Sequence, residues 1–270
     1  MLLRRVLYAI FLLFLSPFAA AEASDERYFR FTYELLDTDF PSGESVDIYV
    51  PAPVDGEGQS VIEESLDTDL QTSTGSEQVH GNKFYRLRRE SGSSTAVKAR
   101  FEWLVARTTV TAGMEDELSE DVSGRYLDAD TLVPVGHEVL DPILREIHAL
   151  RADDSKPATA RAIYDWVVDN VEYKKVGTGW GNGDTFWACS ERYGNCTDFH
   201  ALFVSLARSE GIPAKFEIGF PVPGSRQGGE ISGYHCWVKF FLPEEGWVPI
   251  DASEAAKNPA LRELFYGTHP

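Results

Sequence analysis

Apolar and polar side chains alternate along the first third of the chain. The alternation is clear at residues 28–33 and 46–50, and it returns at 83–87 and 97–110. Stretches rich in Gly, Ser and Pro separate these runs, and no helical period extends through the region. The pattern predicts a small β-sandwich over residues 22–111.

Beyond position 135 the apolar period changes to about 3.6 residues, which is typical of amphipathic helices. Asp141 and Ser155 are suited to cap the first two of these helices, and Gly211 is suited to end the third. The predicted helices cover residues 142–150, 157–171 and 196–210.

Alternation returns after the third helix, again with turn-rich segments between the runs. The predicted strands cover residues 215–220, 234–242 and 247–251. Helices that precede an antiparallel sheet indicate an α+β unit over residues 136–270. The acidic, loop-like residues 112–135 are predicted to connect this unit with the β-sandwich.

Residues 1–21 have the pattern of an export signal. Arg4 and Arg5 precede a short apolar run, and small residues follow at 19–21, as in a secretory signal peptide. The apolar run is too short to span a bilayer, which takes about 20 residues, and no later segment is apolar enough. We therefore predict a periplasmic or secreted protein with no membrane span.

The chain is strongly acidic. It carries 43 acidic and 25 basic residues and a formal charge of −18, which becomes about −20 when Arg4 and Arg5 leave with the signal. Such a surface repels nucleic acid phosphates and anionic membranes, so neither is an expected partner. Cationic peptides are favoured electrostatically, and the oligomeric state is not indicated.

One cysteine, Cys196, stands at the start of the third predicted helix. The free N–H groups and the positive dipole end of a helix stabilise a thiolate there and lower its pKa. An inert structural cysteine would more naturally lie in mid-helix, on the apolar face with Phe199 and Leu202. The position of Cys196 therefore favours a reactive thiol.

A thiolate nucleophile needs a proton-transfer partner, and that partner needs an orienting group. His235 lies near the start of one predicted strand, and Asp251 lies at the end of the next. The short turn between these strands predicts a hairpin, which would bring the two side chains close together. The order of Cys196, His235 and Asp251 suits a catalytic triad.

Three blocks of this sequence resemble transglutaminase-like proteins. They are RYGNCTDFHALF at 192–203 with GIPA at 211–214, HCWV at 235–238, and GWVPID at 246–251. The resemblance covers about residues 135–255 and implies a papain-like α+β core. It also implies that Cys196 attacks an acyl group, His235 transfers the proton and Asp251 orients the imidazole. No acidic loop resembles the calcium sites of the animal enzymes, so no metal or other cofactor is expected.

The implied reaction forms a thioester from a glutamine carboxamide or a peptide bond. Attack by an amine would then cross-link the substrate, whereas water would complete deamidation or proteolysis. The Cys196 backbone N–H is the expected oxyanion donor, and the indole N–H of Trp180 or Trp187 is a candidate for the second. The expected substrates are proteins or peptides, envelope proteins and peptidoglycan stem peptides among them.

The chain has three cysteines, and an odd number leaves at least one thiol outside any internal disulfide. Cys189 and Cys236 are the pair available for a disulfide in an oxidising compartment. Two buried thiols are the alternative. Because neighbouring strand residues point to opposite faces, Cys236 is expected to face away from the catalytic side.

Two other functions stay open at this point. A catalytically inactive transglutaminase-like module of the cell envelope would use the same core for binding or assembly. A zinc hydrolase would use Cys196, His200 and His235 as metal ligands. His200 follows Cys196 by one helical turn, although its position beside Phe203 favours a supporting role in the core.

Overall fold

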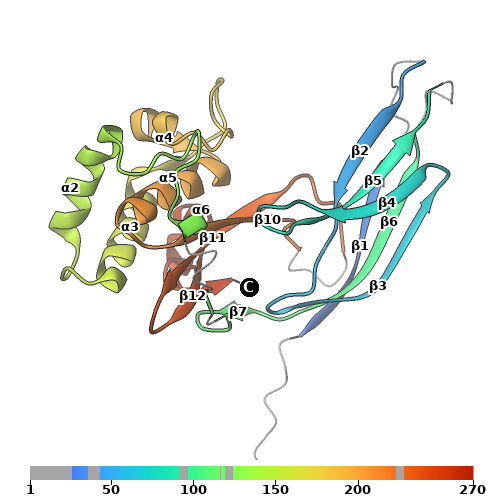
Figure 1. The fold of residues 1–270 in the computed structure, drawn as a ribbon. Helices are drawn as coiled ribbons and strands as arrows, with labels where there is room; N and C mark the ends of the chain where they lie inside the picture. The colour runs from blue at the N-terminus through green and yellow to red at the C-terminus, as the bar shows by residue number, and fades with distance from the viewer. Residues whose placement is uncertain are drawn as a thin grey trace, which may run out of the picture.

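The computed structural model describes residues 26–35, 43–91, 97–115, 117–118, 124–222 and 228–269. They form two lobes, one a β-sandwich and the other a group of helices packed with a small sheet (Figure 1). The predicted signal peptide lies outside the described residues. Within the described ranges, none of the helices has the length and apolar character needed to cross a bilayer.

The first lobe consists of two three-stranded antiparallel sheets, with the orders β1-β6-β3 and β2-β5-β4. Leu87 of one sheet packs with Phe101 and Trp103 of the other in a shared core, as the predicted sandwich requires. The strands are β1 (Arg27–Leu35), β2 (Val46–Pro51), β3 (Gln59–Thr68), β4 (Gln71–Ser76), β5 (Lys83–Arg89) and β6 (Ala99–Arg107).

Strands β3 and β4 were not predicted from the sequence. Most side chains of β3 are exposed, and β4 has the sequence QTSTGS, which contains no apolar residue. An alternating apolar pattern is therefore absent, and these strands are defined by their backbone pairing with β6 and β5 instead. Hydrophobic periodicity does not detect strands of this kind.

The second lobe is an α+β unit, with a three-stranded antiparallel sheet in the order β10-β11-β12. Its helices are α2 (Asp141–Leu150), α3 (Lys156–Asn170), α4 (Thr185–Glu191), α5 (Cys196–Ser209) and α6 (Ala252–Lys257). Its sheet strands are β10 (Ala214–Gly219), β11 (His235–Leu242) and β12 (Gly246–Ile250). Shorter elements are β7 (Val110–Thr111), β8 (Glu172–Tyr173), β9 (Tyr193–Gly194) and β13 (Thr268–His269), with 3-10 turns at Gly124–Tyr126, Glu138–Leu140 and Pro259–Leu261.

The long helices and the sheet strands lie within a residue or two of their predicted positions. Ser155 caps α3 through its hydroxyl, as predicted. Asp141, however, is the first residue of α2 rather than its cap, and Leu140 occupies the cap position without a side-chain hydrogen bond. Helix α4 was missed because seven residues are too few to show a period.

Helix α5 is the central element of the second lobe. Phe199, Leu202 and Phe203 on it are fully buried. The helix contacts α3, α4 and α6 as well as strands β10 and β11. The Phe203 ring lies against Phe240 of β11, with centroids 5.7 Å apart. This packing fixes the first turn of α5 next to the sheet that carries His235.

Charged side chains join the two lobes. The ammonium of Lys239, on β11, is almost fully buried and lies 2.8 Å from Glu57 of the sandwich lobe. Its remaining neighbours are Glu217 at 3.6 Å and Glu115 at 3.7 Å. A buried ammonium is tolerated only with such partners. The ion pairs therefore fix the sandwich against the strand that begins at His235.

A single carboxylate organises the start of α5. Asp198 accepts hydrogen bonds from the backbone N–H groups of Gly181, Gly183 and Asn195. In return, the Asn195 side chain caps the start of α5, so the two residues form a capping box. Asp198 is fully buried. It therefore holds the glycine-rich loop before α4 against the helix.

We expect the substitution Asp198→Ala to lower the free energy of unfolding by about 3 kcal/mol, because three N–H groups would lose their buried acceptor. Urea unfolding measures this change. Asp154→Ala is the control, since the Asp154 side chain is 91% exposed, and we expect it to cost less than about 0.5 kcal/mol. Equal stability of the two variants would contradict the assigned role of Asp198.

Candidate active site

Cys196 is the first residue of α5, as the sequence predicted. The chain reaches it through Gly194, which passes so close to Asp198 that an added Cβ would lie 2.6 Å from the Asp198 Cβ. A side chain at position 194 would therefore displace the turn that presents Cys196. The thiol is buried among the first turn of α5 and the start of β11.

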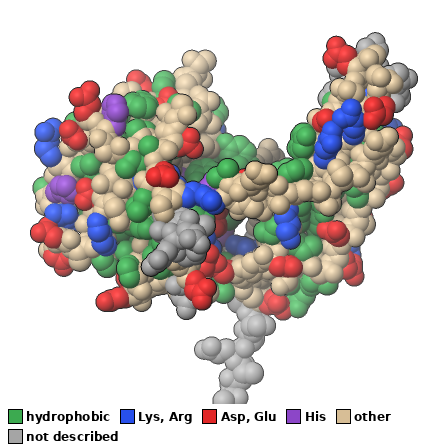
Figure 2. Space-filling view, viewed as in Figure 1, with side chains coloured by type: hydrophobic (Ala, Val, Ile, Leu, Met, Phe, Trp, Pro, Cys, Tyr) green, Lys and Arg blue, Asp and Glu red, His purple; other side chains and the backbone are tan. Residues whose placement is uncertain are grey.

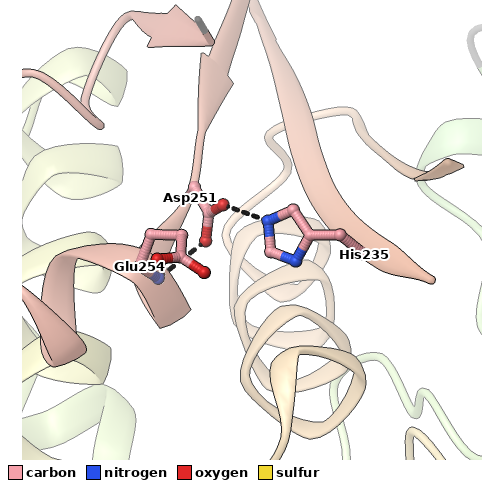
Figure 3. Close-up of side chains that lie close together, drawn as sticks. All are labelled: His235, Asp251 and Glu254. Carbon is pink, nitrogen blue, oxygen red and sulfur yellow. Dashed lines mark hydrogen bonds and ion pairs between the residues drawn. The ribbon is translucent and has the colours of Figure 1, made fainter. Parts of the chain in front are cut away.

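His235 and Asp251 are brought together by the β11–β12 hairpin, also as predicted. The two strands pair from Val238 with Ile250 to Leu242 with Gly246. His235 begins β11, Asp251 follows β12, and His235 Nε2 lies 2.5 Å from Asp251 Oδ2 (Figure 3). Because Asp251 holds Nε2, Nδ1 is the nitrogen that remains for Cys196.

The Asp251 carboxylate is fixed on both oxygens. Its Oδ1 accepts hydrogen bonds from the Ser253 hydroxyl and the Glu254 N–H, each at 2.9 Å, and Asp251 thereby caps α6. Burial raises the pKa of Asp251, but the hydrogen bond from His235 and the other interactions outweigh it and bring the pKa to about 2. The group is thus an anchored anion at neutral pH.

The pKa values of Cys196 and His235 are shifted in opposite directions. A hydrogen bond from the Cys236 thiol lowers the pKa of Cys196; burial opposes this, but a hydrogen bond with His235 assists it, and the pKa falls to about 4. Burial lowers the pKa of His235, but hydrogen bonds with Asp251 and Cys196 outweigh it and raise the pKa to about 10. At neutral pH the pair is therefore a thiolate and an imidazolium.

Cys236 lies on the catalytic side, which corrects the prediction that it faces away. Its sulfur is 3.9 Å from Thr197 Oγ1 and 3.6 Å from His200 Nδ1. Alternation holds along β11, because its ladder with β10 is regular from His235 onward. Cys236 shares the buried face of β11 with Val238 and Phe240, and this strand packs against α5, which begins at Cys196. Burial, and then the neighbouring Cys196, raise the pKa of Cys236, and its thiol stays protonated.

The disulfide between Cys189 and Cys236 that the sequence permitted is not formed. All three cysteines are free thiols. Cys236 is next to α5, whereas Cys189 lies on α4 and packs against the hydrophobic core. Burial raises the pKa of Cys189 to about 11, so this thiol is not activated.

His200 is fully buried below the triad. Its Nε2 lies 3.6 Å from Asp251 Oδ1, and within the described part of the chain this nitrogen has no hydrogen-bond partner. Burial lowers the pKa of His200, so the ring is neutral at pH 7. It supports Asp251 and Cys236 from the core and does not reach solvent as a rival base would have to.

The zinc set considered from the sequence does not assemble. Among the described residues, the group whose ligand atoms lie within 4.8 Å of one another is His235, Asp251 and Glu254 (Figure 3). It includes neither Cys196 nor His200. The short bond between His235 and Asp251 already accounts for the closeness of two of its members.

Neither tryptophan proposed for the oxyanion hole has a free indole N–H. Trp180 donates to the Gly177 carbonyl and Trp187 donates to the Tyr193 carbonyl, each at 3.1 Å. These bonds stabilise the loop before α5 instead. The Cys196 N–H lies in the first turn of α5, where N–H groups have no partner within the helix, and its role as an oxyanion donor stays a prediction.

One residue at the site was not foreseen. The Tyr234 hydroxyl lies 2.9 Å from Thr197 Oγ1 and 3.5 Å from Asn195 Nδ2, so it contacts the residues on both sides of Cys196. The one feature of the sequence that could have indicated a place at the site is that Tyr234 directly precedes His235. The phenol is half exposed and lies beside the start of α5, next to Cys196.

Comparisons with known proteins agree with this geometry. The model of the transglutaminase-like superfamily matches residues 143–252. An uncharacterized protein of Haemophilus influenzae is 32% identical over 117 residues, which are 36% of this chain and 32% of that protein. The uncharacterized protein YebA of Bacillus subtilis is 32% identical over 78 residues, 26% of this chain and 11% of YebA. This chain thus spans a third or less of these relatives.

Among solved structures, the chain resembles a "Putative Cysteine Protease from Cytophaga hutchinsonii" with a TM-score of 0.59 and 18% identity, over 84% of this chain and 79% of that one. At that identity the likeness shows the fold alone. It extends beyond the region matched by the family model. Residues 143–252 therefore form a domain of the transglutaminase-like superfamily.

Proposed function

We propose that this chain is a cysteine-dependent acyl-transfer enzyme that acts on glutamine carboxamides or peptide bonds. The observation that carries the proposal is the arrangement of Cys196 at the start of α5, His235 beside it and Asp251 2.5 Å from the His235 ring. The lowered pKa of Cys196 and the raised pKa of His235 favour a thiolate and an imidazolium at neutral pH. A nucleophile, a proton carrier and an orienting anion are the groups that acyl transfer requires.

The geometry suggests how the reaction proceeds. The Cys196 thiolate attacks the carbonyl carbon, and the positive end of α5 stabilises the negative oxygen that forms. His235 then gives a proton, from Nδ1, to the departing ammonia or amine, which leaves a thioester. An incoming water or amine loses its proton to His235 as it attacks the thioester, and the thiolate is regenerated. Asp251 keeps the imidazole oriented throughout.

We further propose that the enzyme works in the periplasm or outside the cell, on proteins or peptides such as envelope proteins and peptidoglycan stem peptides. The export signal pattern of residues 1–21 supports the location. The acidic surface, with a formal charge of −18, supports neutral or cationic substrates, because it repels anionic ones.

The pH dependence of alkylation tests the ion pair. Cys196 is a thiolate above a pKa of about 4, so iodoacetamide should label it at a nearly constant rate from about pH 5.5 to 8 and more slowly as the pH falls through 4. An ordinary thiol, with a pKa of about 8.5, would lose its reactivity over that whole range. A labelling rate that rises tenfold per pH unit between 6 and 8 would contradict the ion pair.

Loss of the imidazole should slow the same labelling. We expect His235→Ala to reduce the labelling rate of Cys196 at pH 6 by at least about tenfold, because the thiolate loses a charged hydrogen-bond partner and its pKa rises. His148→Ala is the matched control, since His148 is an exposed histidine on α2, and it should leave the rate unchanged. Equal rates in the two variants would rule out His235 as the partner.

Cys236 offers a test of its own. Its hydrogen bond is the largest influence that lowers the pKa of Cys196, so Cys236→Ala should move the midpoint of the labelling profile upward by about one to two pH units. Cys236→Ser keeps a donor and should shift the midpoint less. Cys189→Ala should not shift it, and a shift of equal size there would show that the effect is not local.

Turnover distinguishes acyl transfer from the alternative of an inactive envelope module. The wild-type chain and Cys196→Ala are incubated with casein or stem peptides, with and without a primary amine, and the products are measured by mass spectrometry. Amine incorporation indicates cross-linking, a mass increase of about one dalton indicates deamidation, and backbone cuts indicate proteolysis. Absence of all three, with Cys196 still reactive toward iodoacetamide, would favour the inactive module.

A further inference from the structure

Strand β10 lies at the edge of the catalytic sheet, and among the described strands it pairs with β11 alone. The Pro213 carbonyl accepts a hydrogen bond from the Phe241 N–H at 2.8 Å, so these two residues form a hydrogen-bonded pair of the antiparallel ladder. Hydrogen-bonded pairs recur at every second residue, so Lys215, Glu217 and Gly219 also direct their backbone groups toward β11. The backbone N–H and C=O groups of Phe216 and Ile218 therefore point to the open edge.

These edge groups are unused within the described residues. The preceding carbonyl on the same edge, that of Ala214, accepts the Arg208 guanidinium at 2.8 Å. No other described residue hydrogen-bonds to the backbone of Phe216 or Ile218 on that side. The free pairing groups recur at every second residue, about 7 Å apart, which is the spacing at which an extended peptide presents its own.

The side chains of the same two residues are apolar and accessible. Phe216 is 39% exposed and Ile218 is 61% exposed. Their neighbours Lys215 and Glu217 face the other way, where Lys215 pairs with Glu115 and Glu217 lies 3.6 Å from Lys239. Strand β10 therefore combines an open backbone edge with an apolar face, whereas its charged face is turned toward the sandwich lobe.

This strand adjoins the nucleophile. Ile218 lies opposite Cys236, and Gly219 lies opposite His235. Phe216 lines a hollow of about 480 Å³ together with Thr197 and Ala201 of α5. Residues His80 and Asn82 of the sandwich lobe also line it. Figure 2 shows hydrophobic side chains in the hollow between the two lobes.

We propose that β10 binds the acyl donor as an extended peptide, which adds a fourth strand to the β10-β11-β12 sheet and lies with its reacting carbonyl at Cys196. This inference rests on the proposed function and specifies its substrate. The bound segment is an unfolded or flexible stretch of polypeptide with apolar side chains at alternate positions, which pack on Phe216 and Ile218. Folded helical segments are not substrates, because their backbone groups are already paired.

The test measures binding separately from turnover. Full-length Cys196→Ala is titrated against a fluorescein-labelled nine-residue peptide in which valine and lysine alternate around a central glutamine, and fluorescence anisotropy gives the dissociation constant. Adding Ile218→Pro removes one edge N–H without interrupting the ladder to β11, and it should weaken binding about tenfold. Ile62→Pro is the matched control, because Ile62 is 49% exposed at a bulge of β3, and it should leave the affinity unchanged.

A second measurement keeps the protein intact, in case proline at position 218 disturbs the fold. Two further peptides carry backbone N-methyl groups, one on its valines and the other on its lysines. Only one set of N–H groups can face β10, so only one of the two peptides should lose at least about tenfold in affinity. Equal affinity of both methylated peptides, or no effect of Ile218→Pro in a variant that still unfolds cooperatively, would overturn the proposal.

Sedimentation and turnover separate the remaining outcomes. A parent protein that is dimeric, with a monomeric Ile218→Pro variant, would show that a second copy occupies this edge and would overturn the proposal. If the peptide binds with the expected pattern but the wild-type chain does not modify it, the proposed function is wrong and the docking of a peptide on β10 is still supported. If turnover is unchanged by Ile218→Pro and by N-methylation of the peptide, the docking of the substrate on β10 is wrong, whereas the proposed acyl transfer is still supported.

Discussion

The structure depends on keeping one sulfur atom charged while it is largely removed from water. Burial opposes ionisation of Cys196, and the opposition is overcome by a thiol donor from Cys236, an imidazolium from His235 and the end of a helix. The rest of the lobe is the framework that brings the Cys236 thiol, the His235 ring and the start of α5 together. Asp251 fixes the His235 ring, and Asp198 fixes the start of α5.

Two buried carboxylates hold this framework together, one in the first turn of α5 and the other directly after β12. Asp198 fixes the glycine-rich loop to the start of α5, and Asp251 joins the end of β12 to both the His235 ring and the first turn of α6. Each is a buried carboxylate that accepts several hydrogen bonds. Such multiple acceptance makes a buried anion stable and also makes its geometry specific. Rigid placement of the nucleophile and its partner follows from these bonds.

Much of this arrangement could be predicted from the sequence. The position of Cys196 followed from the apolar period of α5, and the meeting of His235 with Asp251 followed from the short hairpin turn. The facing of Cys236 was predicted wrongly, because the sequence does not show that α5 packs against β11, whose buried face carries Cys236 with Val238 and Phe240. The indole partners of Trp180 and Trp187 depend on loop carbonyls, which no periodic pattern reveals. Strand β4 has no apolar residue, and the few apolar residues of β3 do not alternate with polar ones.

The ion pairs around Lys239 limit the relative movement of the two lobes. The ammonium is on the same strand as His235, and its partner Glu57 belongs to the sandwich lobe. Separating the lobes would take Glu57, the nearest counterion, away from this buried charge, which is unfavourable. Screening by salt is weak at such depth. The ion pair with Glu57 therefore opposes separation of the two lobes beside the strand that carries His235.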